Sequence, residues 1–262
     1  MVKAVAILIL TAFPVVASTS SRVVVRDTVS PAHRDELVDR LRAITGWNDL
    51  DFNSDGALRI TATNADTGSK SARDLISRAV TGDRVILFED ASSRKDVVFC
   101  RVVLGKFLSE PVVEADVYVV LIDFDDFRQV IGDKQARAAF DVGWAVLHEI
   151  DHVVQDSQDP KEDTSAGDCE SHINKMRREL GLAVRNSYFF SYLPVKNDAN
   201  LVSRFVRLGF DQVNTASAKR KRYWLIWDAA IVGGLDSDCA EATDRITVSG
   251  VRLPLASDAC AF

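Results

Sequence analysis

The segment WAVLHEIDHVVQ, residues 144–155, is the part of the chain that most constrains its fold. Its apolar residues recur at the spacing of one helical face, which predicts an amphipathic helix with a buried back. We expect this helix to run from about Lys134 to Gln155. His148 and His152 are four residues apart, so both rings lie on one separate face of the helix, where they can reach the same metal ion.

Residues 148–152, HEIDH, match the pattern HExxH. Glu149 follows the first histidine and points close to the same face, where it can accept a proton from a water molecule that zinc has acidified. The motif therefore predicts one zinc ion with Glu149 as the general base. The second variable position holds Asp151, between the apolar back and the site. This carboxylate could make a hydrogen bond that supports a ligand or could face water, and we expect it to face water.

A catalytic zinc site needs a third protein ligand. The pattern HExxHxxGxxH does not supply one, because Gln155 and Gln158 stand where that pattern has glycine and histidine. A second helix is predicted from about Ser165 to Leu182, and Glu170 and Asn174 border its buried stripe. A carboxylate at the edge of a buried stripe needs a partner, and a metal ion is a suitable one.

We therefore expect Glu170 to be the third zinc ligand. The acidic residues near it are the alternatives: Glu162, Asp163 and Asp168. The alternative without a role in metal binding is that Glu170 is an ordinary surface acid near a helix N-terminus.

The HExxH motif, followed by Glu170 on a second helix and Asn174 four residues later, resembles the Glu-zincin (gluzincin) metallopeptidases. The resemblance extends from Trp144 to about Leu182. It implies zinc-dependent hydrolysis of peptide bonds, with Asn174 as a partner that orients a ligand histidine. It also implies an edge strand that binds extended substrate, for which Ala115–Phe124 is the candidate. The resemblance further implies a downstream side chain that stabilises the oxyanion, and three tyrosines are candidates: Tyr188, Tyr192 and Tyr223.

Two other interpretations compete with a peptidase. The string HEIDH is also similar to peptide deformylases, which would use an upstream cysteine such as Cys100 as third ligand, but the glycine-rich segment of that family is absent. A non-catalytic protein with a structural zinc site, or a degenerate peptidase fold that only binds partners, is the alternative from another class. A structural site is closed by four protein ligands, whereas Glu149 beside the metal favours catalysis.

The beginning of the chain has the pattern of a secretory signal peptide. Lys3 precedes a short apolar run over residues 4–16, and residues 15–17 supply small side chains at the expected cleavage site. We expect residues 1–17 to be removed and residues 18–262 to form one secreted or periplasmic domain. No segment is long and apolar enough to span a membrane. In an oxidising compartment the four cysteines predict disulfides, and we expect the pairs Cys239–Cys260 and Cys100–Cys169.

The remaining sequence predicts an α+β, zincin-like fold. A helix opens at Ser30-Pro31, a hairpin covers residues 49–63, and a second helix covers 71–80. Strands follow at residues 84–89, 97–104 and 115–124, and another at 223–227. We expect a small sheet packed on the active-site helix, followed by a more helical half. The net charge of −6 does not suggest a nucleic-acid partner, so the expected partner is a peptide or protein substrate.

Overall fold

The first sheet has four strands in the order β1-β4-β6-β5. The computed structural model describes residues 21–61, 65–92, 94–105, 116–161, 166–194, 202–213 and 217–232. The strands of this sheet are β1 (Val23–Val25), β4 (Val85–Asp90), β5 (Cys100–Leu104) and β6 (Val117–Ile122). β1, β4 and β6 are parallel, and β5 runs antiparallel to β6. Nearly every residue of β6 is buried, as expected for a strand between two others.

This topology corrects the expected substrate-binding edge. Residues 115–124 were predicted to be an edge strand, but β6 lies between β4 and β5. β6 pairs with β4 on one side and with β5 on the other, so its backbone has no free edge for a substrate. Among the described strands, β5 is the edge next to β6.

Two helices form near the N-terminus close to their predicted positions, and the first begins and ends at its predicted caps. α1 (Pro31–Thr45) begins after Ser30, whose side chain accepts a hydrogen bond from the His33 amide, and ends at Gly46. Gly46 has a φ of 75°, and a Cβ there would lie 2.2 Å from the Thr67 carbonyl oxygen, so only glycine fits. α2 (Lys70–Thr81) follows the short hairpin of β2 (Asp51–Phe52) and β3 (Leu58–Arg59).

The helix that carries the HEIDH motif is shorter than predicted. One helix was expected from Lys134 to Gln155, but the chain forms α4 (Lys134–Ala138) and then α5 (Val142–Gln155). Asp141 caps α5 by accepting hydrogen bonds from the amides of Gly143 and Trp144 at 2.9 and 3.3 Å. This cap starts a new helix because it satisfies amides that a continuous helix would have bonded internally.

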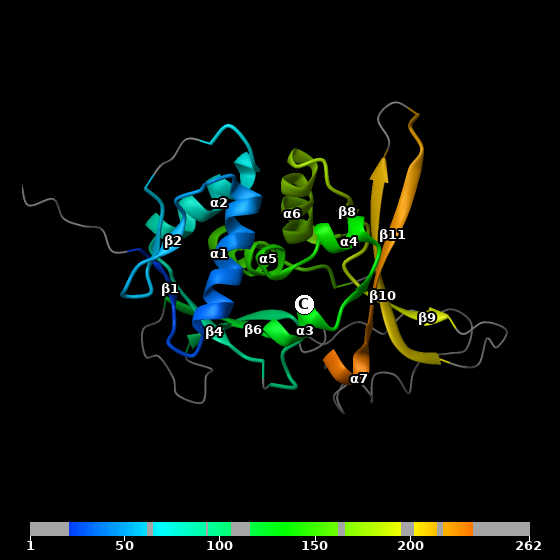
Figure 1. Ribbon diagram of the computed structural model, residues 1–262, viewed down its shortest axis with the longest axis horizontal. Helices are drawn as coiled ribbons and strands as arrows, with labels where there is room; N and C mark the ends of the chain where they lie inside the picture. The colour runs from blue at the N-terminus through cyan, green and yellow to red at the C-terminus, as the bar shows by residue number, and fades with distance from the viewer. Residues whose placement is uncertain are drawn as a thin grey trace, which may run out of the picture.

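α5 occupies the centre of the first hydrophobic core. It contacts β5 and β6 below, α1 and α2 beside it, and α6 (Gly167–Glu179) on another side (Figure 1). Its buried back consists of Val146, Leu147, Ile150 and Val153, which belong to one cluster with the apolar faces of the sheet and helices. The helix is therefore held on several sides, and the positions of its polar side chains are well defined.

The C-terminal part of the described chain is a second sheet, which corrects the expected helical half. It contains β7 (Ile131–Gly132), β8 (Val184–Arg185), β9 (Ser191–Pro194), β10 (Val202–Val213) and β11 (Arg220–Asp228). β10 and β11 form a long antiparallel hairpin, which stands apart from the first sheet (Figure 1). Alternating buried residues along it pack with α4 and Phe99 in a second core. Two short helices complete the fold, α3 (Phe124–Arg128) and α7 (Ala229–Val232).

Helices and strands are both well represented, as in an α+β fold. None of the helices in the described ranges has the length and apolar character needed to cross a bilayer. The expected signal peptide and the Cys239–Cys260 pair lie outside the described residues. The other expected disulfide is not formed, because Cys100 and Cys169 are both free and buried. Cys100 belongs to β5, whereas the Cys169 thiol on α6 donates a hydrogen bond to the His148 carbonyl oxygen.

Candidate metal centre

The two histidines of α5 face a carboxylate from the loop that follows the helix. Nε2 of His148 lies 3.1 Å from Oδ1 of Asp159, and Nε2 of His152 lies 3.1 Å from Oδ2. α5 ends at Asp156, which has a left-handed φ of 51° and turns the chain back toward the helix. Two imidazoles and a carboxylate thus converge at one point.

Each histidine has an oxygen acceptor beside its other ring nitrogen, which is consistent with Nε2 facing Asp159. Nδ1 of His152 donates to the carbonyl oxygen of Ser157 at 2.9 Å. Nδ1 of His148 lies 3.6 Å from Oε2 of Glu170. A carbonyl or a carboxylate beside Nδ1 favours the proton on that nitrogen and leaves the Nε2 lone pair for a metal ion.

A cysteine completes a group of four potential metal ligands. Ligand atoms of His148, His152, Asp159 and Cys169 all lie within 4.8 Å of one another. Imidazole nitrogen, carboxylate oxygen and thiolate sulfur are the three donor types that zinc uses in proteins. The donor set therefore fits a zinc ion.

Unsatisfied buried atoms at the same point support this fit. Within the described ranges, three buried side-chain atoms have no hydrogen-bond partner, and two of them are His148 Nε2 and Asp159 Oδ1. A buried polar atom without a partner costs free energy, and a metal ion bound between these two atoms would satisfy both.

The charges of the group are strongly coupled. Burial alone lowers the pKa of His152, but Asp159 and other negative neighbours outweigh it and raise that pKa to about 11. Burial opposes charge on His148 in the same way, yet Cys169, Asp159 and Glu170 hold its pKa well above the usual range. Burial would raise the pKa of Asp159, but the two imidazoles lower it. The site is thus a compact array of opposite charges, in which a cation can replace protons.

Glu149 lies beside this array and is only 3% exposed. Its Oε2 accepts a hydrogen bond from the Val102 amide of β5 at 2.9 Å. Burial is the main reason that the pKa of Glu149 is raised. A carboxylate with a raised pKa, close to two candidate metal ligands, has the properties of a general base.

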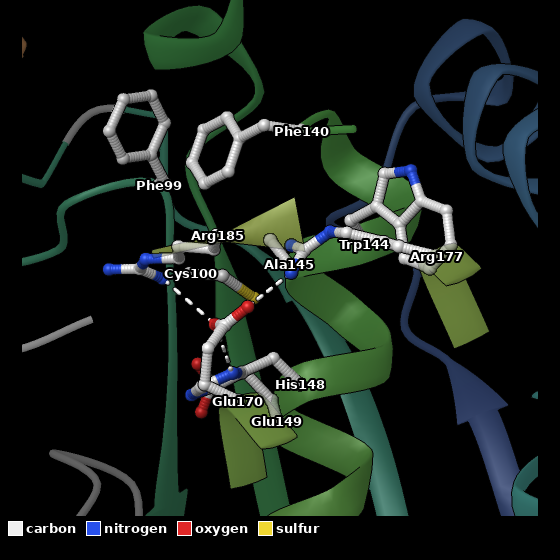
Figure 2. A pocket seen from close by; sticks show the side chains of 10 residues that line it. All are labelled: Phe99, Cys100, Phe140, Trp144, Ala145, His148, Glu149, Glu170, Arg177 and Arg185. Carbon is white, nitrogen blue, oxygen red and sulfur yellow. Dashed lines mark hydrogen bonds and ion pairs between the residues drawn. The ribbon is translucent and has the colours of Figure 1, made fainter. Parts of the chain in front are cut away.

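Glu170 does not occupy the position predicted for it. It is fully buried on α6, where one carboxylate oxygen pairs with Arg177 and the other lies 3.1 Å from Arg185 (Figure 2). Burial would raise the pKa of this carboxyl group, but the two guanidinium groups lower it. Two arginines satisfy the carboxylate that was expected to need a metal, and it meets His148 at Nδ1 rather than Nε2. Asp159, rather than Glu170, faces the Nε2 atoms of both histidines.

Asn174 also differs from its expected role. Its side chain donates to the Arg185 carbonyl oxygen at 2.8 Å and accepts from the Arg185 amide and from Arg177. It therefore holds the arginines that surround Glu170, and no hydrogen bond joins it to a histidine among the described contacts.

Of the three candidate tyrosines, only Tyr188 lies at the site. Its hydroxyl donates to Oδ2 of Asp159 at 2.9 Å, and its ring stacks on His148 with a centroid distance of 6.1 Å. Burial is the main reason that its pKa is raised well above the usual value. Tyr192 and Tyr223 are part of the second hydrophobic core, so packing accounts for both.

The other candidate ligands do not join the group. Glu162 and Asp163 lie outside the described residues. Asp168 is in the first turn of α6 and is absent from the group of metal-ligating side chains. Cys100, the third ligand that a deformylase would need, is likewise absent from it. Cys100 instead lines a small cavity with Glu149, Phe99 and the arginines around Glu170 (Figure 2).

Two residues of the site were missed or misjudged from the sequence. Asp159 stands in a polar loop, and no standard spacing marks it as a ligand. Asp151 was expected to face water, but it is fully buried and accepts hydrogen bonds from Gln155 and Ser157. The sequence does carry a signal for the burial of Asp151: it stands next to the apolar back of a buried helix, where a carboxylate needs hydrogen-bond partners.

No protein-family model matches the sequence, and neither curated proteins nor solved structures show significant similarity to it.

Proposed function

We propose that this chain is a secreted zinc-dependent hydrolase that cleaves peptide bonds. His148, His152 and Asp159 would hold the zinc ion, and Glu149 would act as the general base. The convergence of both Nε2 atoms on one carboxylate, with Glu149 on the same helix, is the observation that carries the proposal. Three protein ligands of this kind are the usual set in catalytic zinc sites.

A bound zinc ion supplies Lewis acidity, which lowers the pKa of water and polarises a carbonyl group. The chain provides the proton transfer. The Val102 amide engages Oε2 of Glu149, so we assign the proton to Oε1. Glu149 would take this proton from the attacking water and deliver it to the leaving amine. Its burial limits contact with solvent and raises its pKa, which strengthens it as a base.

An extended substrate would pair with β5, the described edge strand beside α5. The outward Val102 amide of this strand already meets Glu149, so a peptide lying along β5 would pass next to the proposed base. Main-chain pairing of this kind holds a peptide with little dependence on its side chains. Of the three candidate tyrosines, Tyr188 is the one that contacts the proposed ligands, through its hydroxyl to Asp159 and its ring on His148.

Metal content and peptide hydrolysis, measured together with and without a chelator, test the proposal. We expect one zinc ion per chain and hydrolysis that chelation removes and zinc restores. Asp159→Asn should lower the zinc content, because it replaces a ligand that both histidines face. A chain that binds no zinc, or hydrolysis that is indifferent to chelation, would contradict the proposal.

The role of Glu149 has a separate test. Glu149→Gln should retain zinc and reduce the turnover rate by about 10²–10⁴-fold, the usual contribution of a general base. Glu89→Gln is a suitable control, because Glu89 is a carboxylate of β4 that pairs with Arg26 away from the metal group. Full activity of Glu149→Gln would remove Glu149 from the mechanism.

One observation favours a structural zinc site as the second candidate. Cys169 is fully buried and belongs to the group, so it could close the site as a fourth ligand. Cobalt substitution separates the two candidates, because thiolate ligation produces a sulfur-to-metal charge-transfer band. A band that Cys169→Ser removes, together with no peptide hydrolysis by the zinc protein, would favour the structural site.

A further inference from the structure

Asp151 is a buried carboxylate that the proposed mechanism does not use. It belongs to the HEIDH motif and is fully buried on α5. Oδ2 accepts a hydrogen bond from the Ser157 hydroxyl at 2.6 Å and lies 2.9 Å from Nδ1 of His172. Oδ1 accepts from the side-chain amide of Gln155. Three donors therefore compensate for the burial of this charge.

These donors come from the three parts of the chain that meet at the metal group. Gln155 ends α5, Ser157 lies in the loop after it, and His172 projects from α6. Asp151 thus ties the loop to both helices. We call residues 157–159 the ligand loop, because Asp159 is its last residue.

Ser157 links Asp151 to two of the proposed zinc ligands. Its hydroxyl donates to Asp151, while its carbonyl oxygen accepts from Nδ1 of His152 at 2.9 Å. The carboxylate of Asp159, two residues further along, reaches Nε2 of both histidines. The position of Ser157 therefore sets the orientation of the His152 ring and the start of the segment that delivers Asp159.

We propose that Asp151 is a positioning residue for the metal centre, which acts through Ser157 to preorganise the ligand loop before the metal binds. This inference rests on the proposed function, since it concerns the same site. Without the hydrogen bond between Asp151 and Ser157, the ligand loop would become ordered only when the metal binds, and the lost conformational entropy would weaken binding. Residues that orient metal ligands typically contribute about 10–100-fold to metal affinity.

A matched pair of variants at Ser157 tests the inference without removing a buried charge. Ser157→Ala removes the hydroxyl that meets Asp151, and Ser157→Thr keeps one. We expect Ser157→Ala to weaken zinc binding about 10–100-fold and Ser157→Thr to stay near the wild-type affinity. Competition with a chromophoric chelator measures the affinity, and the visible spectrum of the cobalt-loaded protein reports the ligand geometry.

Asp151→Asn is the complementary variant. An amide keeps the shape but replaces one acceptor oxygen with a donor, so it cannot satisfy three donors, and zinc binding should weaken by a similar factor. Asp156→Asn is the control in the same stretch of chain. Asp156 is exposed and pairs with Arg84, and asparagine tolerates its left-handed conformation. This variant should bind zinc as the wild-type protein does.

The outcomes distinguish this inference from the proposed function. If the wild-type chain binds no zinc, both fail. If it binds zinc and the Ser157→Ala and Ser157→Thr proteins match it in affinity and in cobalt spectrum, only the role of Asp151 is overturned. Equal losses in Ser157→Ala and Asp156→Asn would also overturn it, because the effect would then be general to this stretch. Recovery of affinity specifically in Ser157→Thr supports it.

Discussion

At the scale of single residues, the buried charges determine what each side chain can do. Glu170 has two arginine partners, whereas the partners of Asp159 among the described residues are two imidazoles and the Tyr188 hydroxyl. A carboxylate already neutralised by guanidinium groups has little to offer a metal ion, while one that faces two Nε2 atoms can share a cation with them. The difference between these two acids separates a positioning role from a ligand role.

This difference predicts that substitutions at the two acids affect different properties: stability for Glu170 and zinc affinity for Asp159. Glu170→Gln should lower the free energy of unfolding by about 3–5 kcal/mol, because it leaves buried arginine charge uncompensated. Asp159→Asn should lower zinc affinity without a comparable loss of stability in the metal-free protein. Chemical denaturation of both metal-free variants, together with zinc titration, measures the two effects. A metal-free Glu170→Gln protein as stable as the wild type would show that the arginine pairs contribute little.

At the scale of secondary structure, the start of α5 determines where the motif is presented. Asp141 begins the helix by accepting hydrogen bonds from two amides, and Trp144 packs into the first core one turn later. The break between α4 and α5 places α4 beside the second sheet and α5 beside the first. The cap is therefore the point at which the two parts of the fold separate.

Removing this cap should have a measurable cost. Asp141→Ala should lower the free energy of unfolding by about 1 kcal/mol, the typical contribution of an N-cap side chain. Asp74→Ala is the comparison, since Asp74 is an exposed residue within α2 that pairs with Lys70, and exposed pairs contribute little. Equal effects of the two substitutions in thermal or denaturant unfolding would argue against the capping role.

At the scale of the whole molecule, Asp126 connects the first sheet to the second core. Its carboxylate on α3 accepts a hydrogen bond from the Phe99 amide at 2.9 Å. Phe99 has a left-handed φ of 60°, unusual for a bulky residue, and its ring packs against Phe140 and Trp227. The buried Asp126 carboxylate therefore stabilises the left-handed conformation of Phe99, directly before β5. β5 is the strand whose Val102 amide contacts Glu149.

The same carboxylate predicts a pH dependence of stability. Burial, opposed by the Phe99 amide and reinforced by Asp123 and Asp125, raises the pKa of Asp126 to about 7. The folded state therefore binds this proton more tightly than the unfolded state, where the pKa is about 4. This contribution to stability is present below about pH 4 and is lost as the pH rises toward 7.

Asp126→Asn tests this dependence, because an amide keeps an acceptor for Phe99 and does not ionise. The wild-type protein should lose stability between about pH 4 and 7 relative to Asp126→Asn, as the charged carboxylate becomes costly in the folded state. Denaturant unfolding at several pH values gives both curves. Parallel curves for the two proteins would show that Asp126 does not titrate in this range.

Local sequence rules determined the features that depend on neighbouring residues. The cap at Ser30, the glycine that ends α1, the hairpin at 51–59 and the helical HEIDH motif all follow from turn chemistry and periodicity. These features are decided by contacts within one or two helical turns. The position of His148 and His152 on one face is the strongest example.

Only the tertiary structure decided which acid joins the histidines. Asp159 reaches them because the chain reverses at Asp156 and Asp151 accepts a hydrogen bond from Ser157. Asp151 also meets His172 of α6, a contact that only the packing of the two helices provides. Glu170 is paired with Arg177, two turns along the same helix, and with Arg185 of β8, which only the folded chain brings back to α6. The sequence specifies which ionisable groups exist, but the free energy of burying them is set by partners that only the folded chain brings together.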